Sequence, residues 1–539
     1  MGGGLMQLVA YGAQDVYLTG NPQITFWKVT YRRHTNFAME SIEQTFNGQA
    51  DFGRRVTCTI SRNGDLAYRT YLQVTMPQID QTLESAGNVY ARWLDFPGEQ
   101  LISAVEVEIG GQRIDKQYGD WMHIWNQLTL SKEQERGYYK MVGNTTQLTF
   151  LTDPSFSAVD GPCDATAPKQ VCAPRNALPE TTLYVPLQFW FCRNPGLALP
   201  LIALQYHEVK INLDLRPIDE CLFAVNSLTA DAASVKVTNA YNQSLVAASL
   251  YVDYVFPDTD ERRRMAQSRH EYLIEQLQFT GDESVGSSSN KIKLNFNHPC
   301  KELVWVVQPD ANVDYCSSLE GGKLLYRTLG AQPFNYTDAV DALPNTVLAF
   351  GGLAGVAAGG VGGANTSFID ADGLFTDAGA LDLSSTAASA SSSGYSAPNL
   401  GSVGAVSSGV SDAGTFVMAE ASVDMHCWGE NPVVTAKLQL NGQDRFSERE
   451  GTYFDLVQPF QHHTRAPDTG INVYSFSLRP EEHQPSGSCN FSRIDNATLQ
   501  LVLSNATVSG TATAKVRVYA TNYNVLRVMS GMGGLAYSN

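Results

Sequence analysis

The residue types that most often support catalysis occur here without the spacing that catalysis needs. Nine histidines are present, and His462 and His463 are the only adjacent pair. Neighbouring residues on a strand point to opposite faces of the sheet, so this pair cannot provide the His-x-His cluster of a cupin-type metal site. The G-x-S-x-G nucleophile elbow, the H-E-x-x-H zinc motif and the G-x-x-x-x-G-K-[ST] phosphate loop are all absent. The sequence therefore predicts no catalytic residue, no metal ligand and no cofactor site.

The cysteines are also poorly spaced for metal or redox chemistry. No C-x-x-C pair occurs, which argues against a zinc ribbon and a thioredoxin-like motif. The N-terminus has no basic segment leading into a long apolar run, and Met6 stands where a myristoylation motif requires Ser or Thr. We therefore expect synthesis in the cytosol, with reduced thiols. The nine cysteines are Cys58, Cys163, Cys172, Cys192, Cys221, Cys300, Cys316, Cys427 and Cys489.

The remaining motif with chemical meaning is the N-glycosylation sequon N-x-[ST], which is typical of surface loops. Seven sequons occur, and they are possible glycosylation sites. A chain without a signal peptide would not meet the secretory enzymes of a host, so we expect most of them to be ordinary loop residues. The seven asparagines are Asn144, Asn242, Asn335, Asn365, Asn490, Asn496 and Asn505.

The net charge of −17 argues against a nucleic-acid partner, because phosphate binding requires concentrated Lys and Arg. Two short basic clusters exist, Arg32-Arg33-His34 and Arg262-Arg263-Arg264. We interpret both as surface charge that flanks strands.

Each basic cluster precedes a repeated phrase, which indicates an internal duplication. Ile42-Glu43-Gln44 begins the first copy, and Ile274-Glu275-Gln276 begins the second. The repetition continues downstream, where Gly119 and Gly451 each precede apolar residues at the i, i+3, i+4, i+7 spacing of a helix. These apolar sets are Trp121, Ile124, Trp125 and Leu128 in the first copy, and Tyr453, Leu456, Val457 and Phe460 in the second. We expect equivalent helical turns, the second of them cut short by Pro459.

Most of the remaining sequence alternates with a period of two residues. Val209, Ile211 and Leu213 alternate with polar residues, and the second half shows the same pattern at Val516 and Val518. Such alternation is typical of antiparallel strands with one buried face. Because helical patterns are few, the sequence favours an all-β fold.

A long insertion distinguishes the second copy from the first. Between Asp310 and Glu430 the sequence has 13 acidic residues against Lys323 and Arg327 alone, a net charge of −11. The insertion is rich in Gly, Ala and Ser, which is typical of an elaborated loop. Its uncharged stretch at 347–364 has the length of a membrane span, but its glycines and alanines favour a surface loop instead.

The N-terminus carries the strongest family signature. Residues 4–20 read GLMQLVAYGAQDVYLTG, and with 22–26 and 31–37 they resemble the major capsid proteins of the nucleocytoplasmic large DNA viruses. The segments DTDERRR at 258–264, LNGQDRF at 440–446 and QPFQHHT at 458–464 are similar to later signatures of the same family. The resemblance runs from residue 4 to the C-terminus and is interrupted only by the acidic insertion.

This resemblance implies two tandem eight-stranded antiparallel jelly rolls, with short helices and one long loop insertion. We expect an N-terminal arm over 1–37, the first jelly roll over 38–256 and the second over 257–539. The acidic segment 309–432 should be a surface insertion that projects outward, with its inner strands pairing with loops of the first domain. The arm should pack beneath the first jelly roll and face the virion interior.

The implied function is structural. Three chains would form a homotrimeric, pseudo-hexagonal capsomer, and capsomers would tile the icosahedral shell of a large DNA virus. Implied partners are other copies of the chain, neighbouring capsomers, minor capsid proteins, the penton protein and, indirectly, the inner viral membrane. The chain would be made in the host cytoplasm and reside in the capsid shell of the virion.

Two other classes of protein fit an all-β chain without an active site. One is a glycan-binding jelly-roll protein, which would need an aromatic-lined concave site. The other is a minor or penton-type virion protein, which is usually a single jelly roll, so the duplication counts against it.

Overall fold

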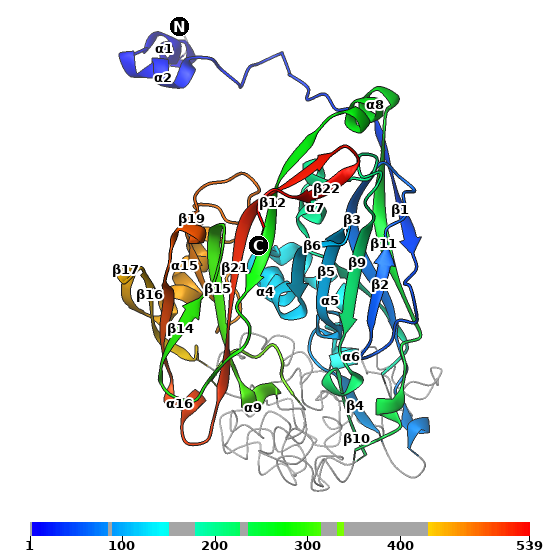
Figure 1. Ribbon diagram of the computed structural model, residues 1–539. Helices are drawn as coiled ribbons and strands as arrows, with labels where there is room; N and C mark the ends of the chain where they lie inside the picture. Colours follow the sequence, from blue (N-terminus) through cyan, green and yellow to red (C-terminus); the bar gives the residue numbers. More distant parts are fainter. Residues whose placement is uncertain are drawn as a thin grey trace, which may run out of the picture.

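Two β-sandwiches of the same topology lie side by side along the chain (Figure 1). The computed structural model describes residues 3–84, 89–149, 178–226, 236–313, 331–338 and 430–538. Asn365, four of the nine cysteines and most of the acidic insertion lie outside these ranges.

The first sandwich has two antiparallel sheets with strand orders β1-β11-β3-β7 and β2-β9-β5-β6. A short strand joins the first sheet beside β3, and a separate two-stranded sheet pairs β10 with β4. The strands are β1 (Phe37–Gln44), β2 (Arg55–Thr59), β3 (Leu66–Met76), β4 (Tyr90–Trp93), β5 (Ile102–Ile109), β6 (Gln112–Tyr118), β7 (Thr181–Pro186), β8 (Leu199–Pro200), β9 (Val209–Leu215), β10 (Leu222–Val225) and β11 (Ala247–Pro257).

The second sandwich repeats this arrangement in the orders β12-β21-β15-β18 and β14-β20-β16-β17. Three short strands extend its first sheet. The strands are β12 (His270–Phe279), β13 (Glu283–Val285), β14 (Ser289–Leu294), β15 (Pro299–Pro309), β16 (Val433–Leu440), β17 (Gln443–Glu450), β18 (Asn472–Ser475), β19 (Cys489–Asn490), β20 (Ala497–Leu503), β21 (Ala514–Met529) and β22 (Met532–Leu535).

In both sandwiches the first, third, sixth and last main strands form one sheet, and the remaining four form the other. This is the jelly-roll topology, and the predicted all-β double jelly roll is confirmed. The repeated phrase lies on equivalent first strands, because Ile42 pairs with Val252 on β11 and Ile274 pairs with Asn524 on β21.

Short helices occupy the connections between strands. The helices of the arm and first half are α1 (Gly3–Val9), η1 (Ala13–Asp15), α2 (Val16–Thr19), η2 (Gln81–Leu83), α3 (Pro97–Leu101), α4 (Gly119–Thr129), α5 (Lys132–Val142), α6 (Thr146–Thr149), α7 (Trp190–Arg193), η4 (Pro195–Leu197), η5 (Ile218–Glu220) and η7 (Ala240–Asn242). The linker and second half contain α8 (Thr259–Gln267), α9 (Asp310–Val313), η11 (Tyr453–Val457), α15 (Gln458–His462), η12 (Phe491–Arg493) and α16 (Asn505–Val508).

Gly119 and Gly451 both begin a helical segment directly after the second strand of a hairpin, as the repeat predicts. The expectation that Pro459 shortens the second helix was wrong. Residues 453–457 form a π-helical turn, and Pro459 lies in the first turn of α15, which continues to His462. A proline is tolerated in a first turn because its missing N–H has no partner to lose there.

Part of the predicted surface insertion is buried, which corrects that expectation for residues 331–338. Tyr336 is 1% exposed, and Ala331 and Gln332 are 2% exposed. The reason is packing, because Tyr336 and Phe334 join an apolar cluster with the first jelly roll's helix α4.

Candidate assembly surfaces

The interface between the two jelly rolls is built from the predicted helical residues of the first copy. Trp121, Ile124, Trp125 and Leu128 lie on one side of α4, and all four are buried. They pack against the outer face of the β12-β21-β15-β18 sheet, to which Val304, Val306, Val473 and Tyr519 belong. The rings of Trp121 and Tyr519 are 5.4 Å apart. Figure 1 shows α4 between the two sandwiches.

Charged side chains reinforce this apolar contact. Asp120 of the first jelly roll is 2.9 Å from Arg517 of the second, and Arg517 also contacts Asp282 at 2.8 Å. Glu275 forms ion pairs with Arg193 of the first jelly roll at 3.2 Å and with Lys301 at 2.6 Å. Removing one partner of a buried pair costs about 3–5 kcal/mol, because the other charge is left without compensation. The two jelly rolls are therefore held in one relative orientation.

Asp115 makes a polar contact across the same interface. Its carboxylate accepts from the backbone N–H of Leu277 on β12 at 3.1 Å and from Gln117 at 3.2 Å. Burial raises the pKa of Asp115 to about 6, against the lowering effect of these hydrogen bonds.

The C-terminal hairpin fastens the second jelly roll onto the first. Leu526 and Val528 on β21, together with Ile274 on β12, belong to the hydrophobic core of the first jelly roll. The backbone N–H of Tyr206 donates to the carbonyl oxygen of Gly531 at 2.9 Å, at the turn between β21 and β22. The first core is thus completed by residues from the end of the chain.

A buried acid lies under the insertion residues. The Glu99 carboxylate is fully buried and lies 2.8 Å from Nδ1 of His123, and it accepts from Asn126 at 3.2 Å and from the Tyr138 hydroxyl. Phe334 stacks on the His123 ring at 4.1 Å. These contacts lie within a packed core, which indicates a structural role.

The adjacent histidines lie at the end of helix α15 rather than on the strand that the sequence argument assumed. His462 contacts the carbonyl oxygen of Leu478 at 3.1 Å, whereas His463 is buried between Glu302 and Glu481, each at 2.9 Å. Burial lowers the pKa of His463, but the two carboxylates outweigh it and raise the pKa to about 9. Within the part of the chain that the structure describes, no group of His, Cys, Asp and Glu could hold a metal ion.

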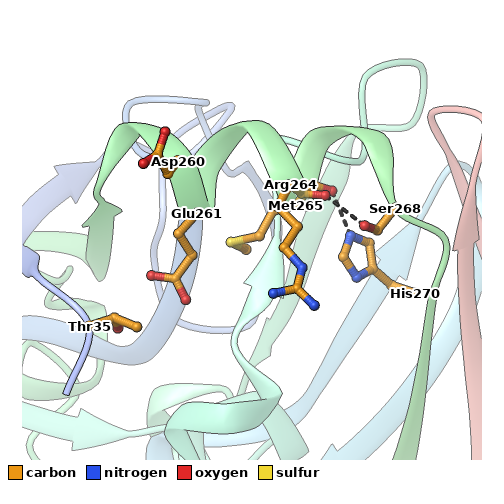
Figure 2. A pocket seen from close by; sticks show the side chains of 7 residues that line it. All are labelled: Thr35, Asp260, Glu261, Arg264, Met265, Ser268 and His270. Atoms are coloured by element: carbon orange, nitrogen blue, oxygen red, sulfur yellow. Dashed lines mark hydrogen bonds between the residues drawn. The ribbon is translucent and has the colours of Figure 1, made fainter. Parts of the chain in front are cut away.

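A hollow of about 530 Å³ lies beside the linker helix α8, where the arm joins the first jelly roll (Figure 2). His270 faces the carbonyl oxygen of Met265 at 2.7 Å, and the Ser268 hydroxyl donates to the carbonyl oxygen of Arg264 at 2.7 Å. Both polar side chains therefore bind backbone carbonyl oxygens. The residues that line the hollow include no nucleophile paired with a base. Its lining residues are Thr35, Asp260, Glu261, Arg264, Met265, Ser268 and His270.

The N-terminal arm does not pack against its own jelly rolls, contrary to the expectation. In Figure 1 it extends away from the sandwiches beyond α8. Its apolar residues are exposed, as at Tyr17 (90%), Phe26 (91%) and Trp27 (101%). An apolar segment that a single chain leaves in water is a candidate contact surface for another molecule.

The sequons differ in accessibility. Asn144 and Asn335 are half-buried, and the side chain of Asn335 donates to Gln332 and accepts from Thr337. The exposed asparagines are Asn242, Asn490, Asn496 and Asn505.

The described cysteines are free, and none is exposed. Burial raises the pKa of the Cys58 and Cys192 thiols to about 11 and that of Cys221 to about 12. These thiols are protonated at neutral pH and therefore unreactive. No helix within the described ranges is long and apolar enough to cross a membrane.

Comparison with known families accounts for both halves of the chain. Residues 25–258 match the family model described as "Major capsid protein N-terminus", and residues 261–534 match "Large eukaryotic DNA virus major capsid protein". The chain belongs to this major capsid protein family. It is 78% identical to the major capsid protein of Phaeocystis pouchetii virus and 73% identical to that of Chrysochromulina ericina virus, over the full length of both chains in each case.

The solved structures agree with this family. A chain of the quasi-atomic model of the PBCV-1 virus capsid matches with a TM-score of 0.60 and 32% identity, covering 96% of this chain and all of that one. The chain is therefore a structural protein of the virion capsid shell, as the resemblance implied, and not an enzyme. The comparisons therefore favour a major capsid protein over the two alternatives, a glycan-binding protein and a minor or penton protein.

Sequence reasoning missed the residues that fasten the two jelly rolls together. Asp120, Arg193, Glu275 and Arg517 are ordinary charged residues on strands or short helices, and nothing in their spacing marks them as buried. The helical residues beside them were found, because an apolar face at helical spacing is visible without the structure.

Proposed function

We propose that three copies of this chain form a homotrimeric, pseudo-hexagonal capsomer, and that capsomers tile an icosahedral shell. The supporting observation is that each chain holds two jelly rolls of the same topology in one fixed orientation. Three such chains around a threefold axis provide six similar units, and a cyclic arrangement leaves no contact surface unused within the ring.

The test is the mass and outline of the purified protein. Sedimentation and native mass measurement at micromolar concentration should give a trimer, and electron microscopy should show particles with a nearly sixfold outline. A stable monomer or dimer would contradict the proposal.

The same proposal divides the chain into an arm, two jelly rolls and one insertion. Residues 1–37 form the arm, 38–256 the first jelly roll and 257–539 the second, with the acidic insertion over 309–432. Its net charge of −11 would repel neighbouring copies if it were buried between subunits, so its bulk should emerge on the capsid exterior. Replacing residues 345–422 with a short Gly/Ser linker should leave the trimer folded.

The arm supplies the proposed contact with the virion interior. Its exposed apolar residues suit capture by minor capsid proteins beneath the shell, with the penton protein and the inner membrane as further, indirect neighbours. Removing residues 1–20 should leave trimers intact but impair shell assembly. Particles that form normally from this truncated chain would refute the role of the arm.

The proposal gives the protein no direct nucleic-acid contact and places its synthesis in the host cytoplasm. Its acidic composition supports the first point.

A further inference from the structure

Two cysteines face each other across the paired strands β15 and β19 of the second jelly roll. Cys300 on β15 lies directly opposite Cys489 on β19 in the antiparallel register. Cys58, the other described cysteine on a strand, lies opposite Ile211 instead. Opposite residues of an antiparallel pair have Cα atoms about 4.5–5.5 Å apart, within the range of about 4.4–6.8 Å that a disulfide spans. The backbone therefore holds the two cysteines at a spacing that suits a disulfide.

Both side chains lie on the core side of the sheet. Cys300 is fully buried in the core of the second jelly roll, and Cys489 packs against the same core. Phe491, two residues after Cys489, is also buried in that core, whereas Asn490 between them is exposed. Since successive residues of a strand point to opposite faces, this alternation places the Cys489 side chain on the same face as Cys300.

The two thiols differ in their access to solvent. Cys300 is fully buried, whereas Cys489 is half-buried. Burial raises the pKa of both thiols, and for Cys489 the positive charge of Arg445 opposes this effect. Both therefore stay protonated and reduced in a reducing compartment. Cys489 is the thiol that can meet a reagent from solvent, and Cys300 can then react with a sulfur held at Cys489.

We propose that Cys300 and Cys489 form a disulfide when the protein meets a small-molecule disulfide of the glutathione class. The Cys489 thiolate attacks one sulfur of oxidised glutathione, which forms a mixed disulfide and releases one glutathione thiolate. Cys300 then loses its proton, and its sulfur attacks Sγ of Cys489 and releases the second glutathione. Two electrons pass from the two cysteines to the glutathione disulfide, and the two protons end on the two glutathione thiols.

This bond fixes a weak edge of the second jelly roll. Strand β19 is only two residues long, so few backbone hydrogen bonds hold it on β15. The connection that leads to it from β18 carries Glu481, which lies 2.9 Å from the buried His463. A cross-link between positions 300 and 489 closes a long loop, which removes much entropy from the unfolded chain. Because both cysteines belong to one chain, the proposal does not depend on the trimer.

Peptide mapping gives the first test. The full-length protein is treated with an excess of oxidised glutathione, and the remaining thiols are then alkylated. Mass measurement of the unreduced peptides should find positions 300 and 489 joined in the wild type and in the control Cys58→Ala, but not in Cys489→Ser. A glutathione adduct on Cys489 without the joined peptide, a bond from either cysteine to a different one, or no oxidation of the pair would each overturn the proposal.

Moving the thiol by one residue tests whether strand register directs the bond. The double variant Cys489→Ser, Asn490→Cys places the thiol on the exposed face of β19, because a shift of one residue reverses the face of a strand. This variant should take up glutathione but form no bond with Cys300. A joined peptide from positions 300 and 490 would show that the pairing of β15 with β19 does not select the partner, and it would overturn the geometric argument.

Thermal unfolding tests the effect on stability. The oxidised wild type should unfold roughly 5–15 °C above the same protein treated with a reductant, because the cross-link closes a long loop. Cys489→Ser should show no such difference. Cys58→Ala should show the same rise as the wild type, even if its own midpoint is lower. Equal midpoints for the reduced protein and a protein with the joined peptide would overturn the proposed fixing of β19.

Discussion

Gly451 lies so close to Val433 that a Cβ atom at position 451 would be 1.8 Å from the Val433 carbonyl oxygen. Gly119 has the same relationship with Ile102, at 2.1 Å. Ile102 begins β5 and Val433 begins β16, so each glycine closes the base of the equivalent hairpin. This close approach starts the helical segment at the same point in both jelly rolls.

Gly451→Ala should therefore destabilise the second jelly roll by about 3 kcal/mol or more, because the crowding atom belongs to the backbone and cannot rotate away. Gly119→Ala should act similarly on the first. Gly137 on α5 is the control, since a Cβ there meets nothing within 4 Å and alanine is the better helix former. Thermal unfolding should show a large fall for the first two variants and no loss for Gly137→Ala. Equal midpoints would contradict the packing argument.

His463 should make the second jelly roll sensitive to alkali. Its pKa is raised to about 9 in the folded protein from an ordinary 6.5, so the protonated ring stabilises the fold. This contribution is complete below pH 6.5 and is lost as the pH rises through 9. His463→Gln should cost about 3–5 kcal/mol at pH 7, because Glu302 stays buried without its cation.

The pH profile separates this effect from simple misfolding. Between pH 7 and pH 10 the unfolding midpoint of the wild type should fall more steeply than that of His463→Gln. Parallel profiles would show that the histidine does not carry its proton in the folded state.

Leu526→Ala should destabilise the first jelly roll, although residue 526 lies near the end of the chain. The side chain is fully buried in the first core, and deleting a buried leucine costs about 2–5 kcal/mol. Met529→Ala is the matched control on the same strand, because Met529 is 42% exposed. Hydrogen exchange should show faster opening of β5 and β9 in Leu526→Ala only. Protection changes confined to the second jelly roll would contradict this assignment.

Among the proposed glycosylation sites, Asn335 should remain unmodified. Its side-chain amide donates to Gln332, and its oxygen accepts from Thr337, which is 8% exposed. A glycan would have to displace these contacts and the packed residues around them. Peptide mass measurement on protein from virions should find any glycans on exposed asparagines such as Asn242. A glycan on Asn335 would require segment 331–338 to leave its buried position.

The sequence predicted the architecture because duplication and strand alternation are local patterns. Ile42 and Ile274, and Gly119 and Gly451, identified equivalent strands and helical turns before any contact was known. The same local reasoning failed at Pro459, where it predicted the end of a helix. Pro459 instead lies in the first turn of α15, which continues to His462.

Composition misled the interpretation of the acidic insertion. Phe334 and Tyr336 are aromatic residues in a Gly, Ala and Ser-rich segment, and they are the ones that pack against α4 and its neighbours. The sequence also could not show which of the two equivalent helical faces is buried and which is exposed. Trp125 and Val457 occupy equivalent positions, but only the three-dimensional arrangement shows that one is 6% exposed and the other 39%.

The position of Leu526 and Val528 in the first core has a consequence for biosynthesis. Translation delivers the strands of the first jelly roll early, but the residues that close its core are made only after nearly all of the second jelly roll. Until then the half-made protein exposes apolar surface around Ile109 and Leu204, where β22 will lie. Folding of the N-terminal half is thus coupled to synthesis of β21 and β22, and chains truncated before these strands would be aggregation-prone rather than stable half-proteins.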